Sequence, residues 1–213
     1  MKGIILEACV DTFSDALIAA QQGANRIELC SDLAQDGLTP SVALTQKVLK
    51  SLTIPIHVMI RIRAGDFHYT PNELALMIDL VHQYKALGVQ GIVFGALQKD
   101  LTIDVDSTQQ IANAADGIAV VFHKAIDLTP DPVAAAKTLI KIKGVSHILT
   151  SGGAPTAKIG AEILRKMGSA SSHLTIIAAG KINQRNFMEI HESLGLAEYH
   201  GKLIVGDLHR QNV

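Results

Sequence analysis

Short runs of β-forming residues recur eight times along this chain of 213 residues, and segments with helical patterns fill most of the gaps between them. The runs start roughly 20–35 residues apart, which is the size of a strand–helix–strand step. A regular alternation of strand and helix predicts a parallel sheet with right-handed crossovers. Eight such strands favour a closed α/β barrel of the TIM type, (β/α)8, over an open sheet. The runs cover residues 4–9, 26–30, 56–61, 91–95, 119–123, 147–151, 175–179 and 198–205.

The length of the chain qualifies this prediction. A TIM-type barrel typically has about 250 residues, and only residues 206–213 follow the last run. We therefore expect one barrel domain over residues 1–213, with its last helix short or missing. One helix start is clear: Thr70 is placed as a cap, Pro71 occupies the first helical position and Glu73 can reach back to the cap.

The composition excludes several classes of function. Apolar residues make up 48% of the chain and charged residues 18%, which suits a folded protein with a sizeable core. The net charge of −1 and the eight aromatic residues argue against a nucleic-acid surface or a membrane surface. No apolar run approaches the ~20 residues that span a bilayer, and the first residues do not resemble a signal peptide. The two cysteines are then expected as free thiols or metal ligands in the cytoplasm.

Polar residues share one face of four predicted strands and cluster near the carboxyl ends. Side chains alternate between the two faces of a strand, and the carboxyl ends of barrel strands carry the chemistry in enzymes of this fold. A slip of one residue would turn these charges into the helix layer. The pattern predicts an inward-facing cluster drawn from Glu7, Cys9, Asp11, Arg26, Glu28, Cys30, His57, Arg61, Arg63 and His123, with Lys124 and Asp127 just beyond it.

The two cysteines are expected to lie close together. Cys9 and Cys30 end neighbouring predicted strands in the same phase, and adjacent strands are about 4.8 Å apart. Two thiolates suit Cu(I) or, with further ligands, Zn(II). The alternative is that both cysteines are simply small buried residues of the core.

The charged residues support a second interpretation. Glu7, Glu28, His123 and Asp127 could exchange protons with a substrate, while Arg61, Arg63 and Lys124 hold its carboxylate or phosphate. The alternative is a layer of buried salt bridges that fills the barrel, and His57 is expected to be a core histidine.

A glycine-rich segment follows the sixth predicted strand. Backbone N–H groups of Ser151, Gly152 and Gly153 could approach an anion there, because barrel phosphate sites usually form from the late loops. A simple turn is the alternative.

Several long segments resemble the CutC family of copper homeostasis proteins. They are ELCSDLAQDGLTPS (28–41), HVMIRIRAGDFHYT (57–70), GIVFGAL (91–97), FHKAIDLTPDP (122–132) and ILTSGGAPTA (148–157), and the match continues in order from EACVD (7–11) to EYHGK (198–202). The resemblance implies a cytoplasmic TIM-type barrel that self-associates as a dimer or tetramer and handles copper. It also implies that Cys9 and Cys30 are ligands of Cu(I).

We therefore expect a cytoplasmic copper homeostasis protein that binds Cu(I) through Cys9 and Cys30. The alternative is a barrel enzyme acting on a small anionic substrate. The chain departs from the family pattern at Ile62, where proline is favoured, and at Lys124, where arginine is usual. Lysine keeps the charge of arginine and loses its bidentate geometry.

Overall fold

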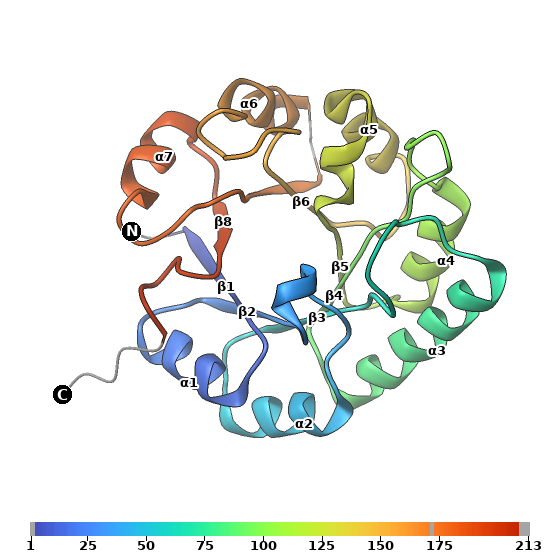
Figure 1. Ribbon diagram of the computed structural model, residues 1–213, viewed down its shortest axis with the longest axis horizontal. Helices are drawn as coiled ribbons and strands as arrows, with labels where there is room; N and C mark the ends of the chain where they lie inside the picture. Colours follow the sequence, from blue (N-terminus) through green and yellow to red (C-terminus); the bar gives the residue numbers. More distant parts are fainter. Residues whose placement is uncertain (1–2, 171–172, 209–213) are drawn as a thin grey trace.

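Eight parallel strands form a closed barrel with consecutive strands as neighbours, and β8 pairs with β1 (Figure 1). The computed structural model describes residues 3–170 and 173–208. The predicted TIM-type barrel is thus confirmed. The strands are β1 (Ile5–Val10), β2 (Arg26–Leu29), β3 (Ile56–Met59), β4 (Gly91–Phe94), β5 (Ala119–Phe122), β6 (His147–Thr150), β7 (Thr175–Ala178) and β8 (Glu198–Gly201).

Helices surround the barrel, and each lies in the connection between two successive strands (Figure 1). Among the described residues that follow β8, 202–208, there is no helix, in agreement with the expected short or missing last unit. The α-helices are α1 (Phe13–Gln21), α2 (Val42–Ser51), α3 (Pro71–Leu87), α4 (Val105–Ala114), α5 (Pro132–Leu139), α6 (Ala161–Ala170) and α7 (Phe187–Leu194); the 3-10 helices are η1 (Leu33–Gln35) and η2 (Lys124–Leu128). No helix among the described residues is long and apolar enough to cross a membrane.

The start of α3 shows how local sequence fixes these elements. The Thr70 hydroxyl accepts a hydrogen bond from the backbone N–H of Glu73, and the Glu73 carboxylate accepts one from the backbone N–H of Thr70. This is the predicted capping box. At the other end of α3, Gly88 adopts the left-handed conformation, with φ of 91°, that glycine tolerates best.

Alternation along each strand separates two apolar cores. Outward side chains such as Ala8, Ile27, Val58 and Ile92 pack in the larger core, beneath the helices. Inward side chains form a smaller cluster inside the barrel. The members of this inner cluster are Cys9, Cys30, Met59, Val93, Val121, Leu149, Ile177 and Ala179. Both cysteines thus line the barrel interior.

The strand register places the polar residues of the first two strands side by side. Glu7 pairs with Arg26, and Cys9 pairs with Glu28. The third strand is shorter than predicted, because β3 ends at Met59 rather than at Arg61. Beyond it, the backbone of Arg61 bonds to Thr39, donating its N–H to the side-chain oxygen and accepting from the Thr39 N–H. Arg61 and Arg63 therefore lie in the loop after β3, where the alternation of side chains along a strand no longer determines which way each arginine points.

Candidate functional site

A cavity of about 810 Å³ opens at the carboxyl ends of the strands. In Figure 1 the η1 turn lies over the barrel interior, and Leu33 of this turn lines the cavity. The cavity combines apolar walls with charged and imidazole side chains. Its polar lining consists of Cys9, Glu28, Asp36, Arg61, His123, Lys124, Lys181, Asn183, His200 and Lys202, and its apolar walls include Met59, Phe67 and Leu149.

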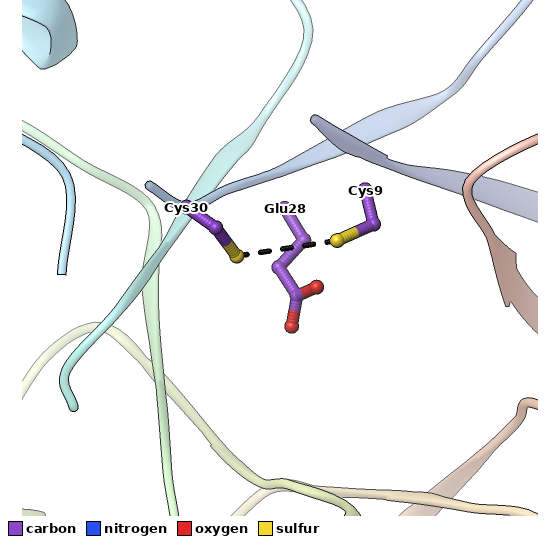
Figure 2. Close-up of side chains that lie close together, drawn as sticks. All are labelled: Cys9, Glu28 and Cys30. Carbon is purple, nitrogen blue, oxygen red and sulfur yellow. Dashed lines mark hydrogen bonds between the residues drawn. The ribbon is translucent and has the colours of Figure 1, made fainter. Parts of the chain in front are cut away.

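The two thiols lie together in the inner cluster of the barrel, and of the two Cys9 lines this cavity. Cys9 Sγ and Cys30 Sγ are 3.9 Å apart, and both cysteines are buried and free of disulfides. Figure 2 shows the two sulfur atoms pointing toward one another, with the carboxylate of Glu28 beside them. One ligand atom from each of these three residues falls within a common 4.8 Å. The predicted closeness of the cysteines is confirmed.

Both thiols are difficult to ionise without a cation. Their mutual hydrogen bond and burial raise the pKa of Cys9 well above its usual value. The hydrogen bond from Cys9 favours the Cys30 thiolate, but burial and the neighbouring carboxylates, Glu28 first, raise the pKa of Cys30 to about 11. A cation bound between the sulfur atoms would favour the thiolate forms, because metal ligation requires deprotonated sulfur.

His200 connects the thiols to the carboxylates. Its Nδ1 lies 2.8 Å from Glu7 Oε1, and its Nε2 lies 3.6 Å from Glu28 Oε2. Burial alone would lower the pKa of His200, but the charge of Glu28 and the hydrogen bond with Cys9 raise it well above the usual value. The imidazole is thus held in its charged form between two carboxylates.

Glu28 keeps one oxygen unpaired. Its side chain is buried, and Oε1 has no hydrogen-bond partner among the described residues. Burial raises the pKa of Glu28, and the charge of Glu7 adds to this effect. A carboxyl group with a raised pKa at a cavity wall is a candidate for proton exchange with a ligand.

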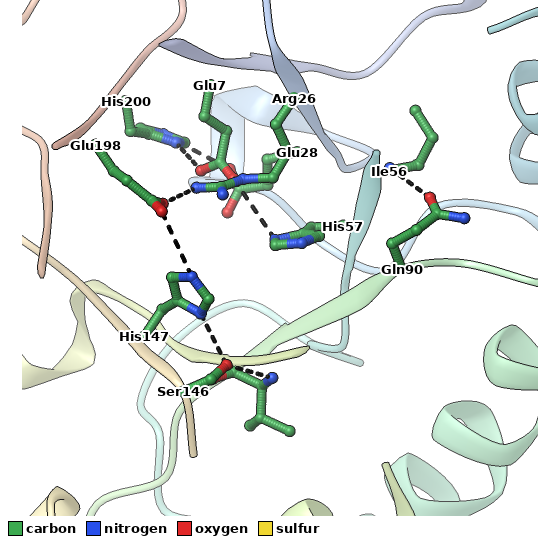
Figure 3. Close-up of polar contacts among 11 residues, drawn as sticks. Glu7, Arg26, Glu28, Ile56, His57, Gln90, Ser146, His147, Glu198 and His200 are labelled. Carbon is green, nitrogen blue, oxygen red and sulfur yellow. Dashed lines mark hydrogen bonds and ion pairs between the residues drawn. The ribbon is translucent and has the colours of Figure 1, made fainter. Parts of the chain in front are cut away.

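Glu7 also belongs to a group of charged and imidazole side chains inside the barrel, which we call the ionic layer: Glu7, Arg26, His57, His147 and Glu198 (Figure 3). Arg26 donates to both carboxylates, with its terminal nitrogen 2.6 Å from Glu198 Oε2. Burial would raise the pKa of Glu7, but His200 and Arg26 hold it far below its usual value. The carboxylate of Glu7 is therefore committed to internal partners.

The two arginines of the Arg-x-Arg sequence have different environments. Arg63 pairs with Glu73, at 2.5 Å, and with Asp66, at 3.0 Å, and it does not line the cavity. Arg61 is buried and lines the cavity, and among the described residues its guanidinium donates only to the backbone carbonyls of residues 35, 37 and 65. Of the two, only Arg61 is placed to meet a ligand in the cavity.

His123 lines the cavity and ends in an unpaired nitrogen. Its Nδ1 accepts from the backbone N–H of Ala125, and its Nε2 has no hydrogen-bond partner among the described residues. Burial, together with the charge of Arg61, lowers the pKa of His123 to about 3. The absence of a side chain at Gly95 makes room for the ring, because a Cβ there would lie 2.5 Å from two ring atoms.

The carboxylate of Asp127 occupies the donors of the glycine-rich segment. It accepts from the backbone N–H groups of Ser151, at 3.0 Å, and Gly153, at 2.8 Å, and from Lys124 Nζ, at 2.5 Å. The N–H of Gly152 is taken by the Thr150 hydroxyl. Burial would raise the pKa of Asp127, but Lys124 and these hydrogen bonds lower it. This cluster therefore satisfies itself, and of its members only Lys124 lines the cavity.

Sequence reasoning missed His200 as a functional residue. It lies in the last predicted strand, two residues after Glu198, so period-two alternation places both side chains on one face. That alternation was the available signal. Two other residues of the ionic layer, His147 and Glu198, were missed in the same way. These two residues lie on β6 and β8, with β7 between them, and His147 Nε2 is 3.6 Å from Glu198 Oε1.

Comparisons with known proteins agree on one family. A model of the CutC family matches residues 4–205. A CutC family protein from Pasteurella multocida is 39% identical over 196 residues, covering 92% of this chain and 80% of that protein. The copper homeostasis protein cutC homolog of Homo sapiens is 38% identical over 200 residues, covering 93% of this chain and 73% of that protein.

Solved structures show the same relationship. The structure described as the copper homeostasis protein CutC from Streptococcus agalactiae superposes with a TM-score of 0.89 at 27% identity, covering 94% of this chain and 99% of that one. The dihydrodipicolinate synthase from Cyanidioschyzon merolae reaches a TM-score of 0.65 at 14% identity, covering 94% of this chain and 70% of that one. This second similarity extends to the fold alone.

Proposed function

Because the chain belongs to the CutC family, we propose that it is a cytoplasmic copper homeostasis protein that binds Cu(I) through Cys9 and Cys30. The names of its relatives associate the family with copper. The observation that carries the proposal is the pair of buried thiols whose sulfur atoms lie 3.9 Å apart, with Cys9 lining the cavity. The proposal includes self-association as a dimer or tetramer, which sedimentation or light scattering would measure.

The donor set at this position suits Cu(I). Soft thiolates select Cu(I) over hard cations that prefer oxygen ligands. The pair lies in the barrel's inner apolar cluster, and both residues are buried. Zn(II) would require further ligands, and Glu28 offers a carboxylate oxygen within 4.8 Å of both sulfur atoms.

An anaerobic titration of Cu(I) against a competing chelator tests the proposal. The wild-type protein is compared with Cys9→Ser/Cys30→Ser, and Met59→Leu serves as a control that removes the other sulfur of the inner cluster. We expect tight binding of one Cu(I) that is lost in the double variant and retained in the control. Equal affinity in the wild type and the double variant would refute this assignment of the ligands.

A second candidate function is proton-transfer catalysis on a small anionic substrate. Glu28 favours it, because this residue lines the cavity, its Oε1 has no hydrogen-bond partner among the described residues, and a general acid or base needs an oxygen that is not already bonded. His200 would orient this carboxylate. Glu7 and Asp127 are saturated by internal hydrogen bonds, so Glu28 takes the acid–base role that the sequence distributes over several groups.

The two functions can be tested separately. Incubation of the protein with a mixture of small organic acids and sugar phosphates should show a substrate consumed by the wild type and left intact by Glu28→Gln. If no acid in the mixture is consumed, the enzyme proposal fails and the copper proposal is unaffected.

A further inference from the structure

Arg61 is a buried cation without a carboxylate partner. Its side chain lines the cavity, and only 4% of the residue is exposed. Within the described part of the chain, its hydrogen bonds go to three backbone carbonyls, and its Nε has no partner. A buried charge is expensive unless it is paired. Arg26, in the ionic layer, has two carboxylates for the same purpose.

His123 presents a second unsatisfied donor to the same cavity. Since Nδ1 accepts from the N–H of Ala125, the proton of the neutral ring must lie on Nε2. The low pKa of about 3, caused by burial and by Arg61, keeps the ring neutral at physiological pH. The free Nε2 is therefore a hydrogen-bond donor and has no lone pair to offer.

The ring of Phe67 brings these two groups into one neighbourhood. The Arg61 guanidinium carbon lies 5.0 Å from the centroid of this ring, and the His123 ring centroid lies 4.9 Å from it. All three side chains line the cavity. A small molecule bound in this cavity would therefore lie close to both groups.

We propose that Arg61 and His123 form a binding subsite for the carboxylate or phosphate group of a small organic acid. Both free groups are donors, so the ligand must supply acceptor oxygens, and the buried positive charge selects an anion.

Other residues of the cavity fit the same class of ligand. Lys181 and Lys202 add positive charge to its lining, which attracts anions. Its carboxylates are those of Glu28, which is next to the thiols, and Asp36. Met59, Phe67 and Leu149 supply an apolar wall for the carbon part of the molecule. A volume of about 810 Å³ suits a metabolite-sized molecule rather than an inorganic ion alone.

The subsite specifies the substrate class of the second candidate function, proton-transfer catalysis. It rests on that proposed function only where a reaction at Glu28 is concerned. Binding itself depends on Arg61 and His123, neither of which belongs to the thiol pair. The protein can therefore bind an organic acid whether or not it binds copper or turns the acid over.

Imidazole ¹⁵N NMR on the histidine-labelled full chain tests the proposal. The probes are glycerol 3-phosphate, glycerate and, as the uncharged control, glycerol. The His123 Nε2 resonance is identified by its loss in His123→Asn, in which an asparagine oxygen can still accept from the Ala125 N–H. We expect the chemical shift of this resonance to change and reach a plateau as the concentration of at least one of the two acids is raised. Glycerol should leave it unchanged. No shift with either acid would overturn the proposal.

Matched variants show whether the shift reports the proposed contacts. Arg61→Lys keeps the charge without the Nε donor, and His123→Asn removes the ring donor. Each should weaken the binding of the effective acid about tenfold or more, measured by calorimetry, as expected for a lost hydrogen bond to a charged group. Arg63→Lys, outside the cavity, should bind as the wild type does. Equal affinity in all three variants would contradict the subsite.

The thiol variant separates this proposal from the others. Cys9→Ser/Cys30→Ser should bind the acid with wild-type affinity, even though it is expected to lose Cu(I). Glu28→Gln should still bind the acid, even if it turns nothing over. Loss of acid binding in the thiol variant, with the fold intact by circular dichroism, would show that the anion does not depend on Arg61 and His123 alone and would refute the proposal.

Discussion

The barrel interior contains two polar regions that differ in how completely their charges are paired. In the ionic layer, Arg26 joins the carboxylates of Glu7 and Glu198, and histidines flank both. Around the cavity, Glu28, Arg61 and His123 each retain a buried polar atom that has no hydrogen-bond partner in the described part of the chain. The carboxylates of the ionic layer are paired with Arg26 and maintain the fold, although His57 Nδ1 there has no hydrogen-bond partner among the described residues, whereas unpaired groups that line a cavity are available to a ligand. We assign stability to the first region and binding to the second.

The largest effect should come from removing the central cation of the ionic layer. Arg26→Met leaves two buried carboxylates without their counter-ion, and we expect a loss of about 3–5 kcal/mol in the free energy of unfolding. Arg61→Met leaves only backbone carbonyls without a donor and should cost about 1–3 kcal/mol. Unfolding in urea measures both. A larger loss of stability in Arg61→Met than in Arg26→Met would contradict the assignment of stability to the ionic layer and binding to the cavity.

Gly91, the first residue of β4, and Gly95, the residue after β4, provide a matched pair of sites for substitution. A Cβ at Gly91 would lie 2.6 Å from the ring of His57 in the ionic layer, and one at Gly95 would lie 2.5 Å from the ring of His123 in the cavity. Overpacking of this kind costs about 1–3 kcal/mol, so both alanine variants should lose similar stability. Only Gly95→Ala should also weaken binding of the acid probe. Weakened binding in both would show that the two regions are coupled.

The pH dependence of stability should reveal the neutral state of His123. Its pKa is about 3 in the folded protein, against an ordinary value of 6.5, so the unfolded chain takes up a proton in this interval while the folded one does not. Stability should therefore fall as the pH is lowered from 6.5 toward 3. His57, with a pKa of about 4, contributes with the same sign.

The substitution His123→Asn tests this assignment. The slope of the free energy of unfolding against pH gives the number of protons taken up on unfolding. Between pH 4 and 6 this number should be about one lower in the variant than in the wild type. The same proton uptake in both proteins would mean that His123 is already charged in the fold, and the donor argument for its Nε2 would lose its basis.

The smallest effect is expected at Lys124. Its side chain is 45% exposed, and the Asp127 carboxylate that it contacts keeps its hydrogen bonds from Ser151 and Gly153. Lys124→Gln should lower the free energy of unfolding by less than about 1 kcal/mol, as for other exposed ion pairs. It should weaken the binding of the acid probe only slightly. A tenfold loss of probe binding would move the anion site toward the glycine-rich segment.

The sequence predicts the barrel well because the barrel rests on local patterns. Alternation along strands and the strand–helix repeat identify all eight strands and place the thiols side by side. Both patterns depend on residues that are close together in the sequence. The expected short or missing last helix likewise agrees with the absence of a helix over residues 202–208.

The pairing of charges could not be predicted because it depends on contacts between distant segments. Arg61 and Arg63 look equivalent in the sequence, yet the loop after β3 directs one to the cavity and the other to Glu73. Ser151 and Gly153 look like donors for an external anion, but Asp127, 24 and 26 residues away, accepts from them. His200 reaches Glu7 across 193 residues through the closure of β8 on β1.

X-ray absorption at the copper K-edge, on protein loaded anaerobically with one equivalent of Cu(I), tests the central proposal most directly. The account predicts scattering from two sulfur neighbours in the wild type and their loss in Cys9→Ser/Cys30→Ser. A first shell of nitrogen and oxygen alone in the wild type, or a spectrum unchanged by the double substitution, would contradict copper binding by this thiol pair.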